Sequence, residues 1–337
     1  MEGVNEDMRR LLLVVLLVAV LVFPSMASAA VRVGIAMPTQ SLQRWNQDGA
    51  NMKAQLEAAG YVVDLQYANN NVALQVSQIE NMILNGADIL VIASIDGASL
   101  GTVLAVAKDE GIPVIAYDRL IMATDAVSYY ATFDNYMVGT IQGEYLVEKL
   151  ELATRKDPVN IEITGGSADD NNARYFYQGA YDAIAPYIES GIVVVPSGQI
   201  AFESVATMEW SSERAQARMD NLIAAHYSDG TRLDAVLCSN DSTALGVTNS
   251  LVNAGFEEFP IITGQDCDIA NMKNILAGRQ SMSIFKDTRT LASNVVKMVQ
   301  AIVKGEEPPI NDTETYHNGV KIVPTYLSAP VFADINN

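Results

Sequence analysis

The chain has 337 residues, with 21 Lys and Arg against 40 Asp and Glu, so its formal net charge is −19. With 49% hydrophobic and 18% charged residues, the composition is that of a folded globular protein with roughly two domains, and it excludes a disordered chain. The acidic balance argues against binding to nucleic acid or to an anionic membrane surface, because few cations remain to neutralise phosphates. Two Cys and two His, far apart in the sequence, leave no metal-binding or disulfide framework.

The N-terminal segment has the pattern of a targeting signal. Arg9 and Arg10 precede an apolar run over residues 11–23, which is shorter than the roughly 20 residues that span a bilayer. Ala27-Ser28-Ala29 supplies the small residues of a cleavage site. We therefore expect residues 1–29 to be a secretory signal peptide and the mature protein to be periplasmic or otherwise exported, and soluble.

The acidic start of this segment is unusual for a signal peptide. Initiation at Met8 would remove this acidic start, from Glu2 to Asp7, so the choice between Met1 and Met8 stays open. A membrane anchor is the alternative interpretation of the same apolar run.

From residue 31 onward, apolar strand-like runs alternate with segments of helical spacing. The first part predicts strands at residues 31–37, 62–67, 88–93, 113–117 and 127–131, with helices at 42–59, 72–84 and 98–110. The alternation then restarts, with helices at 136–150, 173–188, 212–226, 242–254 and 290–304 and strands at 159–164, 192–195, 234–238, 260–263 and 282–285. A polar loop with two prolines follows at 306–313. Strand–helix units of this length predict an α/β protein of two lobes, each a parallel sheet with helices on both faces.

In open parallel sheets, ligands bind beyond the carboxyl ends of the strands. The polar and aromatic side chains that follow the predicted strands are therefore the candidate site residues. They are Arg44, Trp45, Asp118, Arg119, Asp170, Asn172, Asn240, Asp266 and Lys286, together with Trp210, the second of the two tryptophans.

These residue types suit a ligand that carries several hydroxyl groups and an apolar face. Carboxylates accept hydrogen bonds from hydroxyls, Arg and Lys donate them, and Asn does both. An indole offers a flat apolar surface on which the C–H face of a pyranose can stack. The sequence has neither a Gly-Lys-Ser/Thr loop nor a Gly-x-Gly-x-x-Gly motif, so no phosphate or dinucleotide cofactor is expected.

Each candidate also has a purely structural interpretation. Asp170 and Asn240 could simply cap helices, and Asp118-Arg119 could be a structural ion pair. Either tryptophan could belong to the core. The residues taken alone do not name the ligand.

Several short motifs, in this order along the chain, resemble those of the periplasmic monosaccharide-binding proteins of ABC transporters, in the group of xylose-binding and multiple-sugar receptors. The motifs are Arg44-Trp45, Gln78-Ile79-Glu80-Asn81-Met82, Val91–Gly97, Ala116-Tyr117-Asp118-Arg119, Phe133-Asp134-Asn135, Gly165-Gly166-Ser167 with Asp170-Asn171-Asn172, Gly264-Gln265-Asp266 and Phe285-Lys286-Asp287-Thr288. The stretches 93–97, 118–121 and 285–289 look closer to the multiple-sugar receptors.

The resemblance implies a type I periplasmic-binding-protein fold, with two similar doubly wound parallel-sheet lobes joined by three hinge crossings. The expected lobes are residues 30–133 with 286–313, and residues 134–285 with 314–337. The sugar is expected between them.

The resemblance also assigns roles to the candidate residues. Arg44 and Arg119 are similar to the hydrogen-bond donors of the first lobe, with Asp118 as the adjacent acceptor. The polar set of the second lobe is matched by Asp170, Asn172, Asn240 and Asp266, and the lysine at the second crossing by Lys286. Trp45 and Trp210 match the two stacking aromatics.

The expected function is therefore capture of an aldose such as xylose, arabinose, glucose or galactose and its delivery to an ABC permease. We expect a binding protein rather than an enzyme, without cofactor or metal, and a monomer. A chemoreceptor partner is possible with or without transport. A glycoside hydrolase using two of the carboxylates is a rival interpretation, and a sugar-responsive repressor would need a basic helix-turn-helix that the sequence does not show. Cys238 and Cys267 are expected to be buried free thiols on neighbouring strands, with a disulfide as the alternative.

Overall fold

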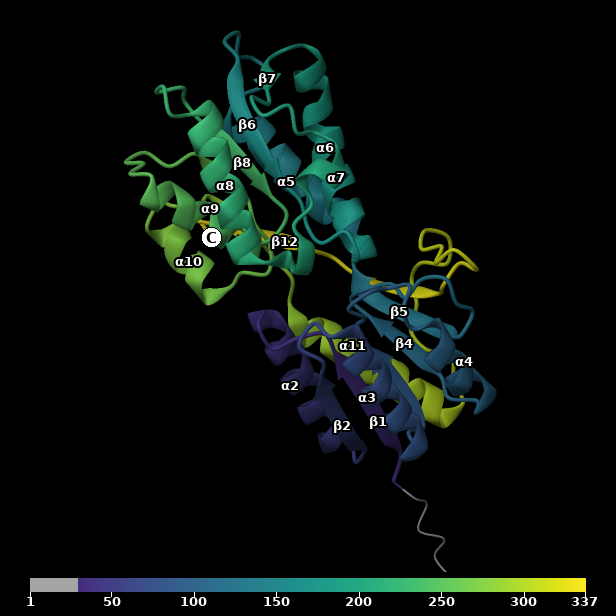
Figure 1. The fold of residues 1–337 in the computed structure, drawn as a ribbon. Helices are drawn as coiled ribbons and strands as arrows, with labels where there is room; N and C mark the ends of the chain where they lie inside the picture. Colours follow the sequence, from purple (N-terminus) through teal and green to yellow (C-terminus); the bar gives the residue numbers. More distant parts are fainter. Residues whose placement is uncertain (1–29) are drawn as a thin grey trace, which may run out of the picture. The chain divides into compact units, whose positions relative to one another are not determined.

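The computed structural model describes residues 30–337 (Figure 1). The expected signal peptide and the choice of start codon fall on residues 1–29, outside the described residues. Within residues 30–337, no helix combines the length and the apolar character needed to cross a membrane.

The first lobe is built on a sheet of six strands, all paired in parallel. The strands, in their order across the sheet, are β11 (Thr325–Ser328), β5 (Val127–Phe133), β4 (Val114–Tyr117), β3 (Ile89–Ile92), β1 (Arg32–Met37) and β2 (Val62–Tyr67). The central strands β3 and β4 are short apolar runs that are buried throughout, as expected for strands covered by helices on both faces.

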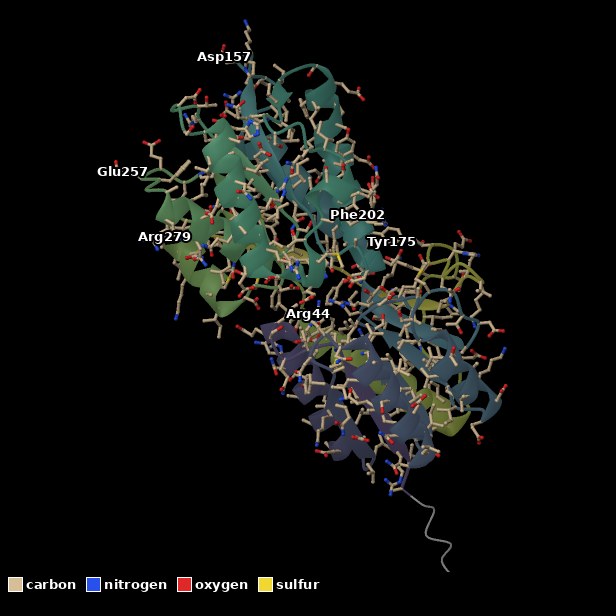
Figure 2. The ribbon with its side chains drawn as sticks, viewed as in Figure 1. Arg44, Asp157, Tyr175, Phe202, Glu257 and Arg279 are labelled. Atoms are coloured by element: carbon tan, nitrogen blue, oxygen red, sulfur yellow. The ribbon has the colours of Figure 1, made fainter. Side chains whose placement is uncertain are left out.

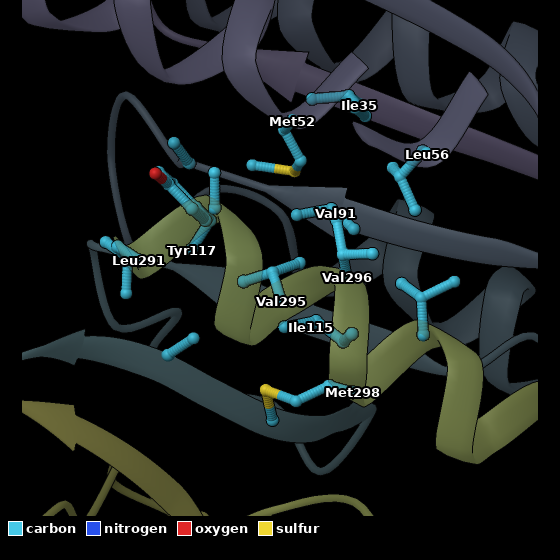
Figure 3. Close-up of a cluster of buried hydrophobic side chains, with 14 of the residues drawn as sticks. Ile35, Met52, Leu56, Val91, Ile115, Tyr117, Leu291, Val295, Val296 and Met298 are labelled. Atoms are coloured by element: carbon cyan, nitrogen blue, oxygen red, sulfur yellow. The ribbon is translucent and has the colours of Figure 1, made fainter. Parts of the chain in front are cut away.

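Helices cover both faces of this sheet. They are α2 (Gln43–Ala58), α3 (Val72–Leu84), α4 (Gly101–Asp109) and α11 (Thr288–Lys304). On one face, Met52 of α2 and Val295 of α11 pack with Ile35 and Val91 of the sheet (Figure 3). On the other face, α3 and α4 pack against the sheet through a second cluster that includes Leu104. The lobe is therefore doubly wound.

The second lobe repeats this plan on a smaller parallel sheet. Its strands, in order, are β7 (Val193–Val194), β6 (Val159–Thr164), β8 (Ala235–Cys238) and β9 (Ile261–Ile262). Its helical segments are α5 (Asn135–Lys149), α6 (Asn171–Glu189), α7 (Phe202–Val205), η1 (Met208–Trp210), α8 (Ser212–His226), α9 (Asp241–Asn253) and α10 (Ile269–Leu276). Apolar clusters again lie on both sides of the sheet.

Three segments of chain connect the lobes. The first runs from β5 into α5, and the second from β10 (Met282–Phe285) into α11. The third joins β11 to β12 (Val331–Asp334), which pairs antiparallel with β10 (Figure 1). This is the predicted fold class.

The expected boundary after residue 313 differs from the structure. β11 pairs with β5, and Tyr316 and Val323 pack in the core of the first lobe, so the assignment of residues 314–337 to the second lobe is wrong as far as Ser328. The physical reason is that Tyr316 and Val323 pack against apolar side chains of the first lobe. The sequence did not show this because β11 has only four residues, too few for an alternating pattern to be visible.

The two cysteines are free, as expected, but only Cys238 is fully buried, whereas Cys267 is partly exposed. Cys238 lies on the buried strand β8, and Cys267 follows β9. Burial raises the pKa of both thiols, so neither has the low pKa of a reactive cysteine.

Candidate functional site

One cavity is lined by residues from both lobes, at the carboxyl ends of the strands. Its lining side chains enclose about 290 Å³ of space between atoms, open solvent at the mouth included. The lining residues are Leu42, Arg44, Trp45, Asp118, Arg119, Asp170, Phe176, Trp210, Asn240, Gln265, Asp266 and Lys286.

The structure brings together all of the predicted site residues except Asn172, which does not line the cavity. Sequence reasoning missed Leu42, Phe176 and Gln265. Gln265 stands inside the motif Gly264-Gln265-Asp266, and Leu42 lies two residues before Arg44, so both could have been found from their neighbours in the sequence. Phe176 lies inside α6 and shares the apolar pattern of a core residue, so no signal in the sequence distinguishes it.

Three of the lining residues have left-handed backbone conformations. The φ angles are 59° at Asp118, 55° at Trp210 and 98° at Asp266. Such values are uncommon for residues other than glycine, and for a bulky residue such as Trp they are outliers. Each costs about 1–3 kcal/mol and persists only where the surrounding structure imposes it. The loops therefore hold these three side chains at the cavity at the expense of stability.

Arg44 lies at the centre of the charged groups, in the first turn of α2, and is labelled in Figure 2. Its Nη2 atom is 2.8 Å from Oδ1 of Asp118, which follows β4 in the same lobe. Its Nη1 atom is 3.5 Å from Oδ1 of Asp266, which belongs to the second lobe. Nη2 also donates a hydrogen bond of 2.6 Å to Oδ2 of Asp48, one helical turn further along α2.

Two further ion pairs complete the charged set. Arg119 Nε is 3.0 Å from Asp170 Oδ2 of the second lobe, and its Nη1 donates to the backbone carbonyl of Ser94 at 3.0 Å. Lys286 Nζ is 3.0 Å from Asp266 Oδ1. All of these side chains are largely buried, so each charge depends on its partners for stabilisation.

Asp118 and Asp170, each paired with an arginine, have pKa values shifted in opposite directions. Burial raises the pKa of Asp118, but the positive charges of Arg44, Lys286 and Arg119 outweigh burial and lower it below its ordinary value. Burial raises the pKa of Asp170, and Arg119 offsets only part of that shift. The cations therefore outweigh burial at Asp118, whereas burial outweighs the cations at Asp170.

The two tryptophans enter the cavity in different ways. Trp45 is 1% exposed and packs in the core of the first lobe, with the guanidinium carbons of Arg44 and Arg119 4.4 and 5.1 Å from its ring centroid. Trp210 packs edge-on against Phe176, and its Nε1 donates to Asp170 Oδ2 at 3.3 Å. Trp210 also lies directly on Gly166, where an added Cβ would be 2.0 Å from the indole.

The two asparagines make structural hydrogen bonds. Asn240 caps α9 through Oδ1, which accepts from the backbone N–H of Thr243 at 2.9 Å. Asn172 Nδ2 donates to the backbone carbonyl of Asp118 at 2.5 Å, and its Oδ1 accepts from Tyr130 at 3.0 Å. Asn172 belongs to the second lobe and its partners to the first, so its amide bridges the two lobes.

The chemistry of the cavity suits a neutral polyhydroxyl ligand. Charged donors and acceptors both line it, and aromatic rings form part of its wall. Among residues 30–337, no cluster of His, Cys, Asp and Glu has the arrangement of a metal site.

A sequence profile of the family described as "Periplasmic binding protein domain" matches residues 33–307. The chain belongs to the periplasmic binding proteins. It is 50% identical to the multiple sugar-binding periplasmic receptor ChvE of Rhizobium radiobacter over 324 residues, covering 95% of this chain and 91% of that one. It is 36% identical to the D-xylose-binding periplasmic protein of Escherichia coli strain K12, covering 91% and 88%. The higher identity to the multiple-sugar receptor agrees with the resemblance drawn from the motifs.

A solved structure of similar fold is an ABC transporter solute-binding protein of Clostridium phytofermentans with bound β-D-glucose. This periplasmic binding protein is 69% identical to it, with a TM-score of 0.90 and coverage of 91% of this chain and 94% of that one. A carbohydrate transporter solute-binding protein of Chloroflexus aurantiacus, in complex with D-glucose, is 32% identical, with a TM-score of 0.82 and coverage of 90% and 93%.

Proposed function

We propose that this protein is an exported solute-binding protein that captures an aldose monosaccharide between its lobes and delivers it to an ABC permease. The observation that carries the proposal is the cavity itself, in which three cations, three carboxylates and two indoles from both lobes converge. This composition matches the hydroxyl groups and the apolar C–H faces of a pyranose.

The relatives favour an aldohexose as the first ligand to test. One similar structure holds β-D-glucose and another D-glucose, and the sequence relatives are named for multiple sugars and for D-xylose. We therefore extend to this chain the binding of glucose, galactose, arabinose or xylose, with glucose as the leading candidate.

The side chains take complementary roles in this proposal. Arg44, Arg119 and Lys286 donate to ring and hydroxyl oxygens, whereas Asp118, Asp170 and Asp266 accept from hydroxyls. Asn240 and Gln265 add polar contacts, because Asn240 lines the cavity and the buried Gln265 Oε1 there has no hydrogen-bond partner in the described residues. Trp210 and Trp45 supply the apolar walls.

Asn172 fits the proposal through lobe closure. Its amide links Asp118 and Tyr130 of the first lobe to α6 of the second, so its hydrogen bonds exist only when the lobes meet. The proposed lobes are residues 30–133 with 286–328, and residues 134–285 with 329–337. A ligand that contacts both lobes binds their closed arrangement better than the open one and so shifts the population toward closure.

The cellular setting follows from the same proposal. The relatives are periplasmic, and we extend this location to the mature chain, with residues 1–29 removed as a signal peptide. The partners are then a membrane permease and, for signalling, a chemoreceptor. The protein acts as a monomer.

Glycoside hydrolysis is the second candidate, because Asp118 and Asp170 have pKa values shifted apart, as in an acid and base pair. We propose binding without catalysis, since both carboxylates are in ion pairs with arginine and the family consists of receptors. Turnover of nitrophenyl glycosides that is lost in Asp170→Asn would favour the hydrolase.

Isothermal titration calorimetry tests the proposed function. The mature protein is titrated with D-glucose, D-galactose, L-arabinose and D-xylose, with sorbitol as an acyclic control. At least one aldose should bind with one site per chain and sorbitol should not. Absence of heat and of any thermal stabilisation with every aldose would contradict the proposal, because a ligand of the folded state raises its stability.

A further inference from the structure

Asp48 is a buried carboxylate that does not line the cavity. Its side chain is 0% exposed, it belongs to α2, and no part of it contributes to the cavity wall. A fully buried carboxylate is unfavourable unless it is paired and hydrogen-bonded, so its partners indicate what it does.

The hydrogen-bond partner of Asp48 is the guanidinium of Arg44, at the centre of the site. Asp48 stands four residues after Arg44, a spacing that places both on one face of the helix. The bond from Arg44 Nη2 to Asp48 Oδ2 is 2.6 Å, shorter than the 2.8 Å from the same nitrogen to Asp118 Oδ1. Asp48 therefore fixes the guanidinium from the helix side, while Asp118 and Asp266 approach it from the loops.

The other groups around Asp48 come from several elements. Tyr67 of β2, Tyr117 at the end of β4, Asp118 and Lys286 all interact electrostatically with it. The charged set then contains four carboxylates, Asp48 included, against the three cations Arg44, Arg119 and Lys286. Asp48 is thus not needed to neutralise the site.

We propose that Asp48 is a positioning residue for sugar binding, which holds the Arg44 guanidinium in the orientation that meets the ligand. This inference rests on the proposed function. Without the Asp48 carboxylate, the remaining carboxylates paired with Arg44 are Asp118 and Asp266, the two acids that the sugar must also engage. Arg44 then competes with the ligand for them.

Asp48 does not stabilise the fold at neutral pH, which indicates that its role is not structural. Burial raises the pKa of Asp48 to about 6, despite the opposing effect of Arg44. A carboxyl group whose folded-state pKa is raised contributes stability below its unfolded pKa and loses that contribution as the pH rises through the folded value. Ionised Asp48 therefore destabilises the fold at pH 7.5, and an uncharged replacement does not.

The test is Asp48→Asn, with the affinity for the best aldose measured by calorimetry at pH 7.5 and at pH 5. At pH 7.5 the dissociation constant should rise about tenfold, the usual effect of weakening one hydrogen bond between charged groups. At pH 5 the two proteins should differ less, because wild-type Asp48 is then largely protonated. The melting temperature at pH 7.5 should be equal to or higher than that of the wild type.

Two controls separate positioning from general damage. Glu162→Gln removes another fully buried carboxylate, held by Ser197 and Tyr227 away from the cavity, and should leave the affinity unchanged. In an Arg44→Gln background, Asp48→Asn should have no further effect on affinity, since Asp48 acts through Arg44. If Asp48→Asn gives no cooperative melt, Asp48→Ser replaces it in the same measurements.

The outcomes distinguish this inference from the proposed function. A wild-type protein that binds no aldose defeats the proposed function. A wild-type protein that binds, together with an Asp48→Asn variant of equal affinity at pH 7.5, defeats the positioning role alone. The positioning role is also defeated if Asp48→Asn lowers the affinity as much in the Arg44→Gln background as in the wild type. It is defeated as well if Asp48→Asn lowers the affinity as much at pH 5 as at pH 7.5.

Discussion

Gly166→Ala is the substitution whose effect on the site can be worked out most directly from the structure. A Cβ at position 166 would stand 2.0 Å from the six-membered ring of Trp210, whereas an ordinary carbon–carbon contact is about 3.5 Å. The indole must therefore move by about 1.5 Å or the backbone must shift. No left-handed φ is recorded at Gly166, so the effect comes from this contact and not from backbone strain.

The displaced indole loses two interactions. Its edge-on contact with Phe176 is worth about 0.5–1.5 kcal/mol, and its hydrogen bond to Asp170 about 1 kcal/mol. If the same positioning is needed for the sugar, the affinity falls by about 1.5–2.5 kcal/mol, which is roughly 10- to 70-fold. Overpacking of the buried site also lowers the free energy of unfolding by about 1–3 kcal/mol.

Calorimetric titration of Gly166→Ala with the best aldose measures this loss, and near-ultraviolet circular dichroism follows the environment of the tryptophans. Gly101→Ala is the matched control, because a Cβ there meets only one atom, at 3.9 Å. Its affinity should equal that of the wild type. A Gly166→Ala protein that folds and binds with unchanged affinity would refute the claim that Trp210 forms a wall of the sugar site.

Three other substitutions or conditions have defined outcomes. Asn172→Ala should weaken the binding of every aldose by about tenfold without changing their order of affinity, because it removes a hydrogen bond between the lobes. A change in this order, measured by competition titration, would contradict the prediction and indicate that Asn172 contacts the sugar. Lys286→Met should lower affinity more than tenfold by leaving the buried Asp266 carboxylate with less compensation, whereas Lys53→Met, on the exposed side of α2, should not. Burial raises the pKa of Asp268 to about 7 and that of Asp48 to about 6, so both stabilise the fold at acidic pH and lose this contribution as the pH rises through those values. The melting temperature should therefore fall between about pH 4 and pH 7, where the folded protein keeps protons that the unfolded chain has lost. The fall should be less steep in Asp268→Asn, and an identical slope would contradict this assignment.

The sequence predicts the fold well because the relevant signals are local. The apolar runs at β3 and β4, and the glycines that end the first helices, mark alternating strands and helices without any knowledge of tertiary contacts. β11 was missed because four residues carry no clear period, and only pairing with β5 defines it.

Some residues of the candidate site could also be predicted from the sequence, and others could not. Arg44, Asp118 and Asp266 could be predicted because they belong to the segments that come after strands, at the carboxyl ends of the two sheets. Phe176 could not, since only the packing of α6 against Trp210 brings it to the cavity. Asp48 has the spacing of an ordinary surface ion pair on a helix, and its burial against the sheet is what distinguishes it.

The most direct test of the central claim is a crystal structure of the mature protein with D-glucose at saturating concentration. The account predicts one pyranose between the lobes, with its hydroxyls bonded to Asp118, Asp170 and Asp266 and one face against Trp210. A sugar bound elsewhere on the molecule, or a cavity in which the arginines and carboxylates stay paired with one another and exclude it, would contradict the account.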